Sequence, residues 1–281
     1  MNGDLLFKYC NRASRFMVID KTLLHYRDEG QGPILLMLHG AFSSLHTWND
    51  WTERLKSKYR ILRFDLIGFG LTGPTDDNDY SMEAHLRVVN IFLDTLNINE
   101  PITLIGSSLG GWLAWEYALH APARIHKLVL VDAAGFLDDK SIPAPFKLVK
   151  MPLFGRMTKY VVSRQMIERY IRQVYHNQDL VTSLLIERYF ELFTREGNPD
   201  AFVELVNQRF TDRTAKLKKI TAPTLILWGE QDFWIPVDNA YMFLLEIPRS
   251  ELVVYPECGH LPMEELAEAS CNDLLDFLEN F

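Results

Sequence analysis

The stretch Pro101-Ile102-Thr103-Leu104-Ile105-Gly106-Ser107-Ser108-Leu109-Gly110 decides the fold. Its last five residues match the pattern G-x-S-x-G, and residues 102–105 are a short apolar run of the kind that forms strands. Residues 111–118 follow with helical composition and contain no helix breaker. A strand, a sharp turn and a helix form the context in which this pattern exposes one serine hydroxyl. The sequence therefore predicts that Ser108 is a nucleophile.

The rest of the chain alternates between strand-like and helix-like runs. Residues 34–38 are continuously apolar, as expected of a strand buried on both faces of a parallel sheet. Other strands are expected at 16–19, 22–26, 59–64, 102–105, 127–131, 224–228 and 251–255, and helices at 45–57, 81–96 and 262–281. Buried strands that alternate with helices predict an α/β fold, a doubly wound and mostly parallel sheet.

A segment of different composition interrupts this alternation. Residues 136–219 hold 15 Lys+Arg against 10 Asp+Glu, whereas the remaining residues hold 14 against 27. Three helical runs lie in this segment, at 165–174, 180–193 and 201–210. We expect a core domain of residues 1–135 and 216–281, with residues 136–215 inserted as a helical cap over the carboxyl ends of the strands. Residues 1–15 show no clear pattern and are expected to form a loose arm.

Partners for Ser108 follow the last two strands. His260 lies in a loop between the final strand and a helix that begins with a proline, where a general base is expected. Asp232 follows the strand before it, and the order Ser108, Asp232, His260 is the chain order of this kind of elbow. Asp132 also ends a strand near the elbow, so it stays open as the alternative acid, with loop structure as its expected role.

An oxyanion hole needs two donors beside the nucleophile. We expect the backbone N–H of Leu109 to be one and that of Ala41, or alternatively Phe42, to be the other. His39 is expected to stabilise its loop. Structural or surface positions are expected for His25, His46, His85, His120, His126 and His176. Cys258 is expected to be a packed apolar residue, Glu230 a solvated loop residue, and Ser107 to point away from the site. No residue pattern calls for a metal or an organic cofactor.

With these motifs in place, residues 16–281 resemble an α/β-hydrolase. The resemblance rests on residues 39–40, 65–70, 106–111, 229–232 and 259–260. It implies that Ser108, Asp232 and His260 form a catalytic triad, that Ala41 and Leu109 supply the oxyanion hole, and that the loop at Asp65 is structural.

Branches of that family differ at the nucleophile and in the loop after His-Gly. Haloalkane dehalogenases and the family's epoxide hydrolases use aspartate where this chain has Ser108, which excludes both. Carbon–carbon hydrolases of ring-fission products share the serine and a cap, but usually carry a glycine-rich stretch where this chain has Ala41-Phe42-Ser43-Ser44. The departure favours a carboxylesterase or a lipase-like enzyme.

The resulting expectation is a serine hydrolase that cleaves carboxylic esters through an acyl-enzyme on Ser108. The interleaved apolar and basic residues 142–154 point to an apolar acyl or lipid-like substrate, and to peripheral lipid contact through the cap. The alternative is a carbon–carbon hydrolase of ring-fission diketone acids. A hydroxynitrile lyase, a perhydrolase and a ligand receptor without turnover stay open as further classes.

The composition of the chain limits which binding partners and which cellular compartment are expected. The net charge of −8 argues against nucleic acid, and no apolar run reaches the ~18 residues that a membrane helix needs. Three cysteines without metal-ligand spacing suggest a reducing compartment. The N-terminal residues lack the pattern of a signal peptide. We therefore expect a cytoplasmic enzyme, a monomer or small homo-oligomer, that acts on a small-molecule ester without stable membrane insertion.

Overall fold

A computed structural model describes residues 3–136, 147, 149–150, 162–208 and 211–280. One sheet holds the eight strands in the order β1-β2-β4-β3-β5-β6-β7-β8. Their bounds are β1 (Ser14–Ile19), β2 (Thr22–Glu29), β3 (Ile34–Leu38), β4 (Arg60–Phe64), β5 (Ile102–Ser107), β6 (Ile125–Val131), β7 (Thr224–Gly229) and β8 (Ser250–Tyr255). All eight expected strands are present, and the largest difference at any end is three residues.

The sheet is mostly parallel, as predicted. Strand β2 pairs antiparallel with β1 and β4, and every other neighbouring pair is parallel. The central strands β3, β5, β6 and β7 are buried along their length apart from one exposed position in β6. This burial explains their continuous apolar runs, because helices cover both faces of the sheet.

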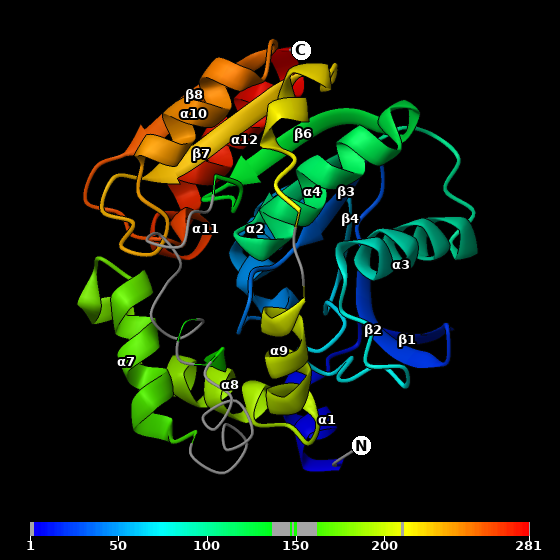
Figure 1. Ribbon diagram of the computed structural model, residues 1–281, viewed down its shortest axis with the longest axis vertical. Coiled ribbons are helices and arrows are strands. Elements are labelled where there is room, and N and C mark those ends of the chain that lie inside the picture. The colour runs from blue at the N-terminus through cyan, green and yellow to red at the C-terminus, as the bar shows by residue number, and fades with distance from the viewer. Residues whose placement is uncertain (1–2, 137–146, 148, 151–161, 209–210, 281) are drawn as a thin grey trace.

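Helices pack on the two faces of the sheet (Figure 1). One face carries α3 (Met82–Thr95), α4 (Leu109–His120) and α10 (Asp238–Glu246), and the other carries α2 (Asn49–Leu55), α11 (Pro262–Glu265) and α12 (Ala267–Asn280). Ser81 caps α3 by accepting the Ala84 N–H at 3.2 Å. The closing helix expected at 262–281 is broken at Leu266 into α11 and α12. No helix of the described segments is long and apolar enough to span a bilayer.

Between β6 and β7 the chain forms α7 (Arg164–Val174), α8 (Ser183–Phe193) and α9 (Asn198–Asn207), which we call the inserted helices. Figure 1 shows them beyond the edge of the sheet at which β6 and β7 end. Each begins within three residues of its expected start. The described residues also form short 3-10 turns: η1 (Leu45–Trp48), η2 (Pro122–Arg124), η3 (Gln178–Leu180) and η4 (Thr214–Lys219). The expected apolar and basic lining at 142–154 lies largely outside the described residues.

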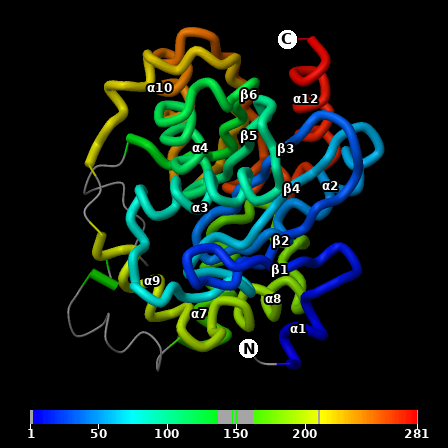
Figure 2. Tube along the Cα trace, turned by 90° about the vertical axis from the view of Figure 1, so that its right-hand side faces the viewer, coloured from blue at the N-terminus to red at the C-terminus, as the bar shows by residue number. Residues whose placement is uncertain are grey.

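The N-terminal residues are not the loose arm that we expected. Residues Gly3–Tyr9 form helix α1, which lies beside α8 (Figures 1 and 2). Tyr9 donates a hydrogen bond to Glu191 of α8 at 2.5 Å, and Lys8 pairs with Glu187 and Glu191. The prediction was wrong because these contacts join residues about 180 positions apart, and no local periodicity marks them.

Candidate active site

Ser108 occupies a strained turn between β5 and α4. Its backbone has φ 53° and ψ −116°, a conformation that a non-glycine residue keeps only when its surroundings hold it. Its N–H donates to Val131 O at 3.1 Å, and its carbonyl accepts from Ala134 N–H at 3.0 Å, so both sides of the residue are tied to the end of β6. A side chain at Gly106 would lie 2.1 Å from Gly110 O, which explains the glycine in the motif. The elbow predicted from the sequence is confirmed as local structure.

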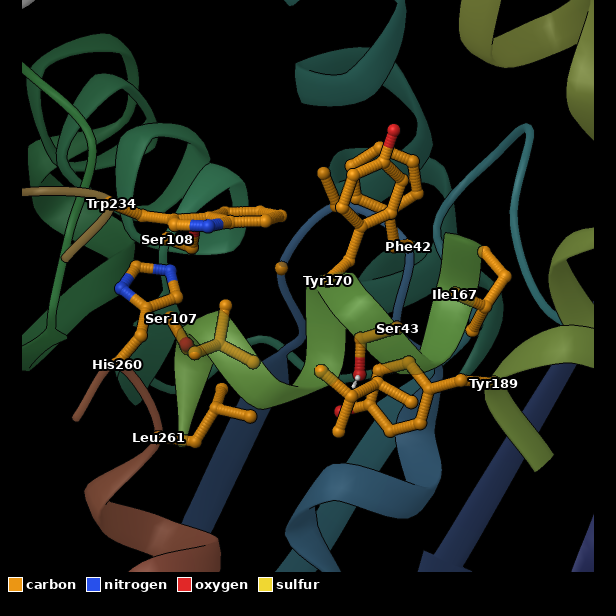
Figure 3. Close-up of a pocket in the computed structure, with 14 residues that line it drawn as sticks. Phe42, Ser43, Ser107, Ser108, Ile167, Tyr170, Tyr189, Trp234, His260 and Leu261 are labelled. Carbon is orange, nitrogen blue, oxygen red and sulfur yellow. Dashed lines mark hydrogen bonds between the residues drawn. The ribbon is translucent and has the colours of Figure 1, made fainter. Parts of the chain in front are cut away.

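His260 and Asp232 meet beside this turn. His260 Nδ1 and Asp232 Oδ2 are 2.6 Å apart, and both side chains are buried. The other oxygen of Asp232 accepts the backbone N–H groups of Trp234 and Ile235 at 2.8 and 3.0 Å. Three hydrogen bonds therefore fix the carboxylate, and with it the ring of His260. Among the described residues, His260 Nε2 has no hydrogen-bond partner, and His260 lines the same pocket as Ser108 (Figure 3).

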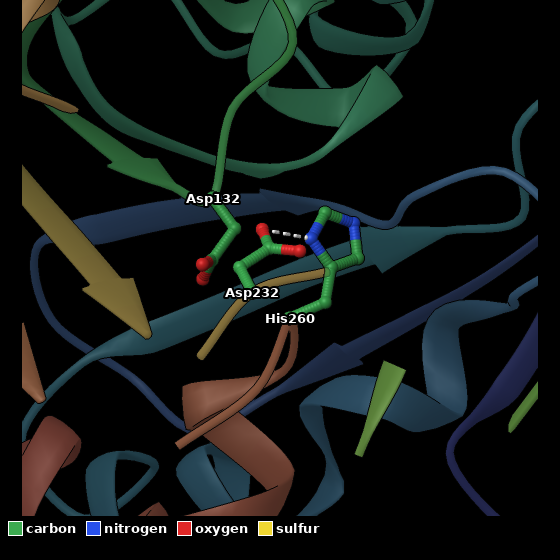
Figure 4. Close-up of side chains that lie close together, drawn as sticks. All are labelled: Asp132, Asp232 and His260. Atoms are coloured by element: carbon green, nitrogen blue, oxygen red, sulfur yellow. Dashed lines mark hydrogen bonds and ion pairs between the residues drawn. The ribbon is translucent and has the colours of Figure 1, made fainter. Parts of the chain in front are cut away.

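Asp132 lies next to this pair without replacing Asp232. The side-chain polar atoms of Asp132, Asp232 and His260 lie within 4.8 Å of one another (Figure 4), but the carboxylate that is hydrogen-bonded to the His260 ring is that of Asp232. Asp132 instead accepts the N–H of Gly229 at 3.0 Å, and so joins the ends of β6 and β7. Complete burial and the neighbouring Asp232 charge hold the pKa of Asp132 well above its usual value. This trio matches a hydrogen-bonded base and its acid better than a metal site, since His260 Nδ1 is already engaged.

The raised pKa of Asp132 predicts a pH-dependent gain in stability for Asp132→Asn. An acid whose pKa is higher in the folded than in the unfolded chain binds more protons when folded, so the free energy of unfolding falls as pH rises above its ordinary pKa. Asparagine does not titrate, so it removes this fall in the free energy of unfolding, and its side-chain oxygen can still accept the Gly229 N–H. We expect the variant to melt above the wild type at about pH 8, with the difference shrinking toward about pH 4.

Thermal unfolding between these two pH values measures this effect. Asp276→Asn serves as the control, because Asp276 is exposed on α12. A constant difference between Asp132→Asn and the wild type at every pH would contradict the prediction.

Leu109 and Ala41 are the residues that were predicted to supply the oxyanion hole. Leu109 is the first residue of α4, so its N–H belongs to the free donors of a helix N-terminus. Ala41 lies in the loop after β3 and lines the pocket with Ser108. The loop approaches Ser108 closely, because a side chain at Gly40 would lie 2.9 Å from Ser108 Cβ.

His39 stabilises this loop, as predicted. Its Nδ1 lies 2.7 Å from Gly40 O, and its Nε2 accepts the N–H of Leu66 at 2.9 Å. Burial lowers the pKa of His39, which keeps the ring neutral and able to serve both contacts.

The pocket at Ser108 is narrow and mostly apolar. Its cavity volume is about 40 Å³, and its walls come from the loop after β3, the elbow, α7, α8 and the loops of Asp232 and His260. The lining residues are Gly40, Ala41, Phe42, Ser43, Ser107, Ser108, Ile167, Tyr170, Ile171, Val174, Tyr189, Trp234, His260 and Leu261. Ser107 is among them, and its hydroxyl is fully buried. The five lining residues from the inserted helices were not predicted, and neither was Trp234, because no motif marks them.

A partly buried charged network lies behind one wall of the pocket. Arg188 donates to Glu264 at 3.1 Å, and the same carboxylate accepts the hydroxyls of Tyr175 at 2.7 Å and Tyr189 at 3.2 Å. The Tyr189 hydroxyl also lies 3.5 Å from Ser43 Oγ, which faces the pocket. The positive charge of Arg188 is therefore balanced one layer away from the cavity.

The loop that carries His260 is anchored to the inserted helices. The N–H of His260 donates to the carbonyl of Val174, at the end of α7, at 2.7 Å. Glu265 accepts the N–H groups of Gly259, His176 and Asn177 at 2.8 to 2.9 Å. Sequence reasoning missed both anchors. Acidic residues in the first turn of a helix indicate an interaction with the helix dipole and do not reveal contacts with a distant loop.

Most of the remaining polar residues take the roles that we expected. His25 Nδ1 lies 2.8 Å from the buried Asp65, whose other hydrogen bonds come from the backbone N–H groups of Leu45 and Leu71. Burial raises the pKa of Asp65, but its interactions with His25, His39 and His46 together outweigh burial and bring the pKa below its usual value. Burial raises the pKa of Cys258, which keeps it a neutral packed thiol, and Glu230 is exposed.

Comparisons with known proteins agree with this geometry. A sequence model of the alpha/beta hydrolase fold matches residues 33–266. A 2-hydroxy-6-oxononadienedioate/2-hydroxy-6-oxononatrienedioate hydrolase from Cupriavidus pinatubonensis is 30% identical, over 95% of this chain and 96% of its own. A thermophilic esterase from Thermogutta terrifontis superposes with a TM-score of 0.79 at 25% identity, over 92% of this chain and 93% of its own. A meta-cleavage product hydrolase from Pseudomonas fluorescens IP01 reaches 0.81 at 23% identity, over 94% and 97%.

Proposed function

The chain belongs to the α/β-hydrolase fold family, and from this we propose that it is a serine hydrolase that cleaves carboxylic esters with an apolar acyl part. The observation that carries the proposal is that Ser108 and His260 line one apolar pocket, while Asp232 is hydrogen-bonded to Nδ1 of His260. Serine needs a base to become a nucleophile, and that base needs a group that holds its tautomer.

The reaction begins when Ser108 attacks the acyl carbonyl while His260 Nε2 takes the hydroxyl proton. Asp232 keeps the other ring proton on Nδ1 and stabilises the imidazolium that forms. His260 then gives its proton to the departing alcohol, which leaves the acyl group as an ester on Ser108. Water attacks this acyl-enzyme with His260 as base, and the acid is released. In both steps the N–H groups of Leu109 and Ala41 would bind the oxyanion, each donor contributing about 10²–10³ in rate.

Electrostatics of the pocket support an uncharged acyl group. No lysine or arginine is among its described lining residues, and the nearby charge of Arg188 is balanced by Glu264. A carboxylate placed in an apolar cavity loses its hydration without gaining a partner, which strongly disfavours binding. The aliphatic and aromatic side chains of α7 and Trp234 instead offer contact to a neutral acyl chain.

A carbon–carbon hydrolase is the second candidate. The names of the sequence relatives support it better than they support ester hydrolysis. The relative from Cupriavidus pinatubonensis is named for a 2-hydroxy-6-oxo diacid, and a 27% identical relative from Burkholderia cepacia is named 2-hydroxy-6-oxo-6-phenylhexa-2,4-dienoate hydrolase. The same serine could attack the 6-oxo carbon of such a substrate. The substrate carboxylate would then need a cation, and Arg188 would have to exchange Glu264 for it.

A substrate panel separates the two candidates. We expect a measurable kcat/KM on p-nitrophenyl esters. On a 2-hydroxy-6-oxo-6-phenylhexa-2,4-dienoate the kcat/KM should be at least ~100-fold lower. This is about the factor by which one unpaired buried charge weakens binding. Glu264→Gln frees Arg188 from its carboxylate partner, so it should raise activity on the dienoate and leave the esters nearly unchanged. A preference of the wild type for the dienoate would refute the ester proposal and establish the second candidate.

A further inference from the structure

Phe42 has a backbone conformation that its residue type disfavours. Its φ is 62°, in the left-handed region where bulky side chains are rare. Such a conformation persists only when surrounding contacts hold it, and it is concentrated at functional sites. Phe42 directly follows Ala41, the proposed oxyanion donor, and its side chain lines the pocket of Ser108.

Four aromatic rings hold the Phe42 ring in place. The centroid distances are 4.3 Å to Phe202, 5.0 Å to Phe193, 5.9 Å to Tyr170 and 6.0 Å to Trp234. These rings come from all three inserted helices and from the loop of Asp232. Phe42 is 7% exposed, so it is packed as a core residue although it forms a wall of the cavity.

The size of the cavity follows from this packing. About 40 Å³ is room for roughly three water-sized groups, which matches the carbon chain of a short acyl group. Figure 3 shows Phe42 across the pocket from His260. Behind the Phe42 ring lie Phe193 and Phe202, which are 4% and 1% exposed, so the space that the ring occupies borders on apolar side chains and not on solvent.

We propose that Phe42 sets the length of the acyl group and restricts the enzyme to short-chain acyl substrates. The proposal rests on the proposed function and names the substrate class of that site. A wall held by core packing does not yield readily to a longer chain, because moving it opens gaps among the rings that hold it. Removing the ring joins its volume to the cavity and gives a longer acyl chain an apolar place to lie.

The test compares kcat/KM on p-nitrophenyl butyrate and octanoate for the wild type, Phe42→Ala and Phe193→Ala. Phe193→Ala is the matched control, since it truncates a ring of the same cluster that does not line the pocket. We expect the wild type to prefer butyrate. Phe42→Ala should raise the octanoate-to-butyrate ratio by ~10-fold or more, because each further buried methylene is worth about fourfold. Phe193→Ala removes one of four supports but leaves the Phe42 ring as the wall, so its ratio should shift clearly less than that of Phe42→Ala.

The ratio cancels any general loss of activity from the loop. Phe42→Leu, which keeps an apolar side chain, should give an intermediate ratio and replaces Phe42→Ala should that variant fail to fold. A wild-type preference for octanoate, or an equal shift in Phe42→Ala and Phe193→Ala, would overturn the proposal.

Covalent labelling keeps the two proposals distinguishable. The rates at which ethyl and octyl fluorophosphonates inactivate the protein depend on Ser108 and on the pocket, and not on ester turnover. An enzyme that is inactivated but hydrolyses no ester would refute the proposed function, and the ethyl-to-octyl preference would still test Phe42. Equal inactivation rates for both probes in the wild type would refute the role of Phe42 alone.

Discussion

Replacing Ser108 with alanine is expected to abolish covalent labelling by a fluorophosphonate and to lower kcat by ~10⁶, the loss typical of removing a triad serine. The hydroxyl is the atom that would form the acyl-enzyme, and no neighbouring group can take its place on the strained turn. A small activity above the uncatalysed rate should remain, since the proposed oxyanion donors are backbone groups and survive the substitution. Labelling is measured by intact-protein mass, and turnover by ester hydrolysis.

Ser107→Ala is the matched control for this experiment. Ser107 lines the same pocket and its hydroxyl is buried, but it precedes the turn that exposes Ser108. The control should retain labelling and most of its turnover. Labelling that survives in Ser108→Ala, or that is lost in Ser107→Ala, would remove Ser108 from the role of nucleophile.

Asp232→Asn should lower kcat by ~10⁴, because it reverses the tautomer of His260. The N–H groups of Trp234 and Ile235 hold the Asp232 oxygen that does not face the ring, so an asparagine is expected to present its amide oxygen to them. Its NH₂ group then faces His260 Nδ1, which must give up its proton. The proton moves to Nε2, and the ring can no longer accept a proton from Ser108. Substrate binding should change little, so the loss should appear in kcat and not in KM.

Asp132→Asn separates this effect from a general disturbance of the buried carboxyl pair. It makes the same chemical change within 4.8 Å of the same histidine. We expect kcat to fall by less than about tenfold, since Asp132 bonds to Gly229 and not to the ring in the structure. Comparable losses in the two variants would assign the orienting role to both acids together.

The sheet could be predicted from local pattern alone. The runs at residues 34–38 and 224–228 are apolar because these strands are buried on both faces, and the turn between β1 and β2 falls at Asp20 and Lys21, both with positive φ. Family membership followed from the motifs at the strand ends. Helix α1 could not be predicted, since an isolated helix of seven residues is marginal in water and its stability here comes from α8.

The site was predictable where a motif marks a strand end, and not where walls come from distant segments. Ser108, Asp232 and His260 lie together as expected, although their chemical roles stay a prediction. The positive φ of Phe42 has no local signal, because it depends on rings supplied by residues more than 120 positions away. The prediction of ester hydrolysis rested on the loop after His39-Gly40. The sequence relatives favour carbon–carbon hydrolysis instead.

The hydrogen bond from His260 N–H to Val174 O links the size of the substrate to the rate of the chemical step. A bulky substrate that displaces α7 would use part of its binding energy to break the contact that fixes the backbone of His260, the proposed general base. Binding energy spent in this way is lost from the transition state, so oversized substrates should show a low kcat even when they bind well. Selectivity in this enzyme then acts on the chemical step, and a competitive binding assay alone would underestimate it.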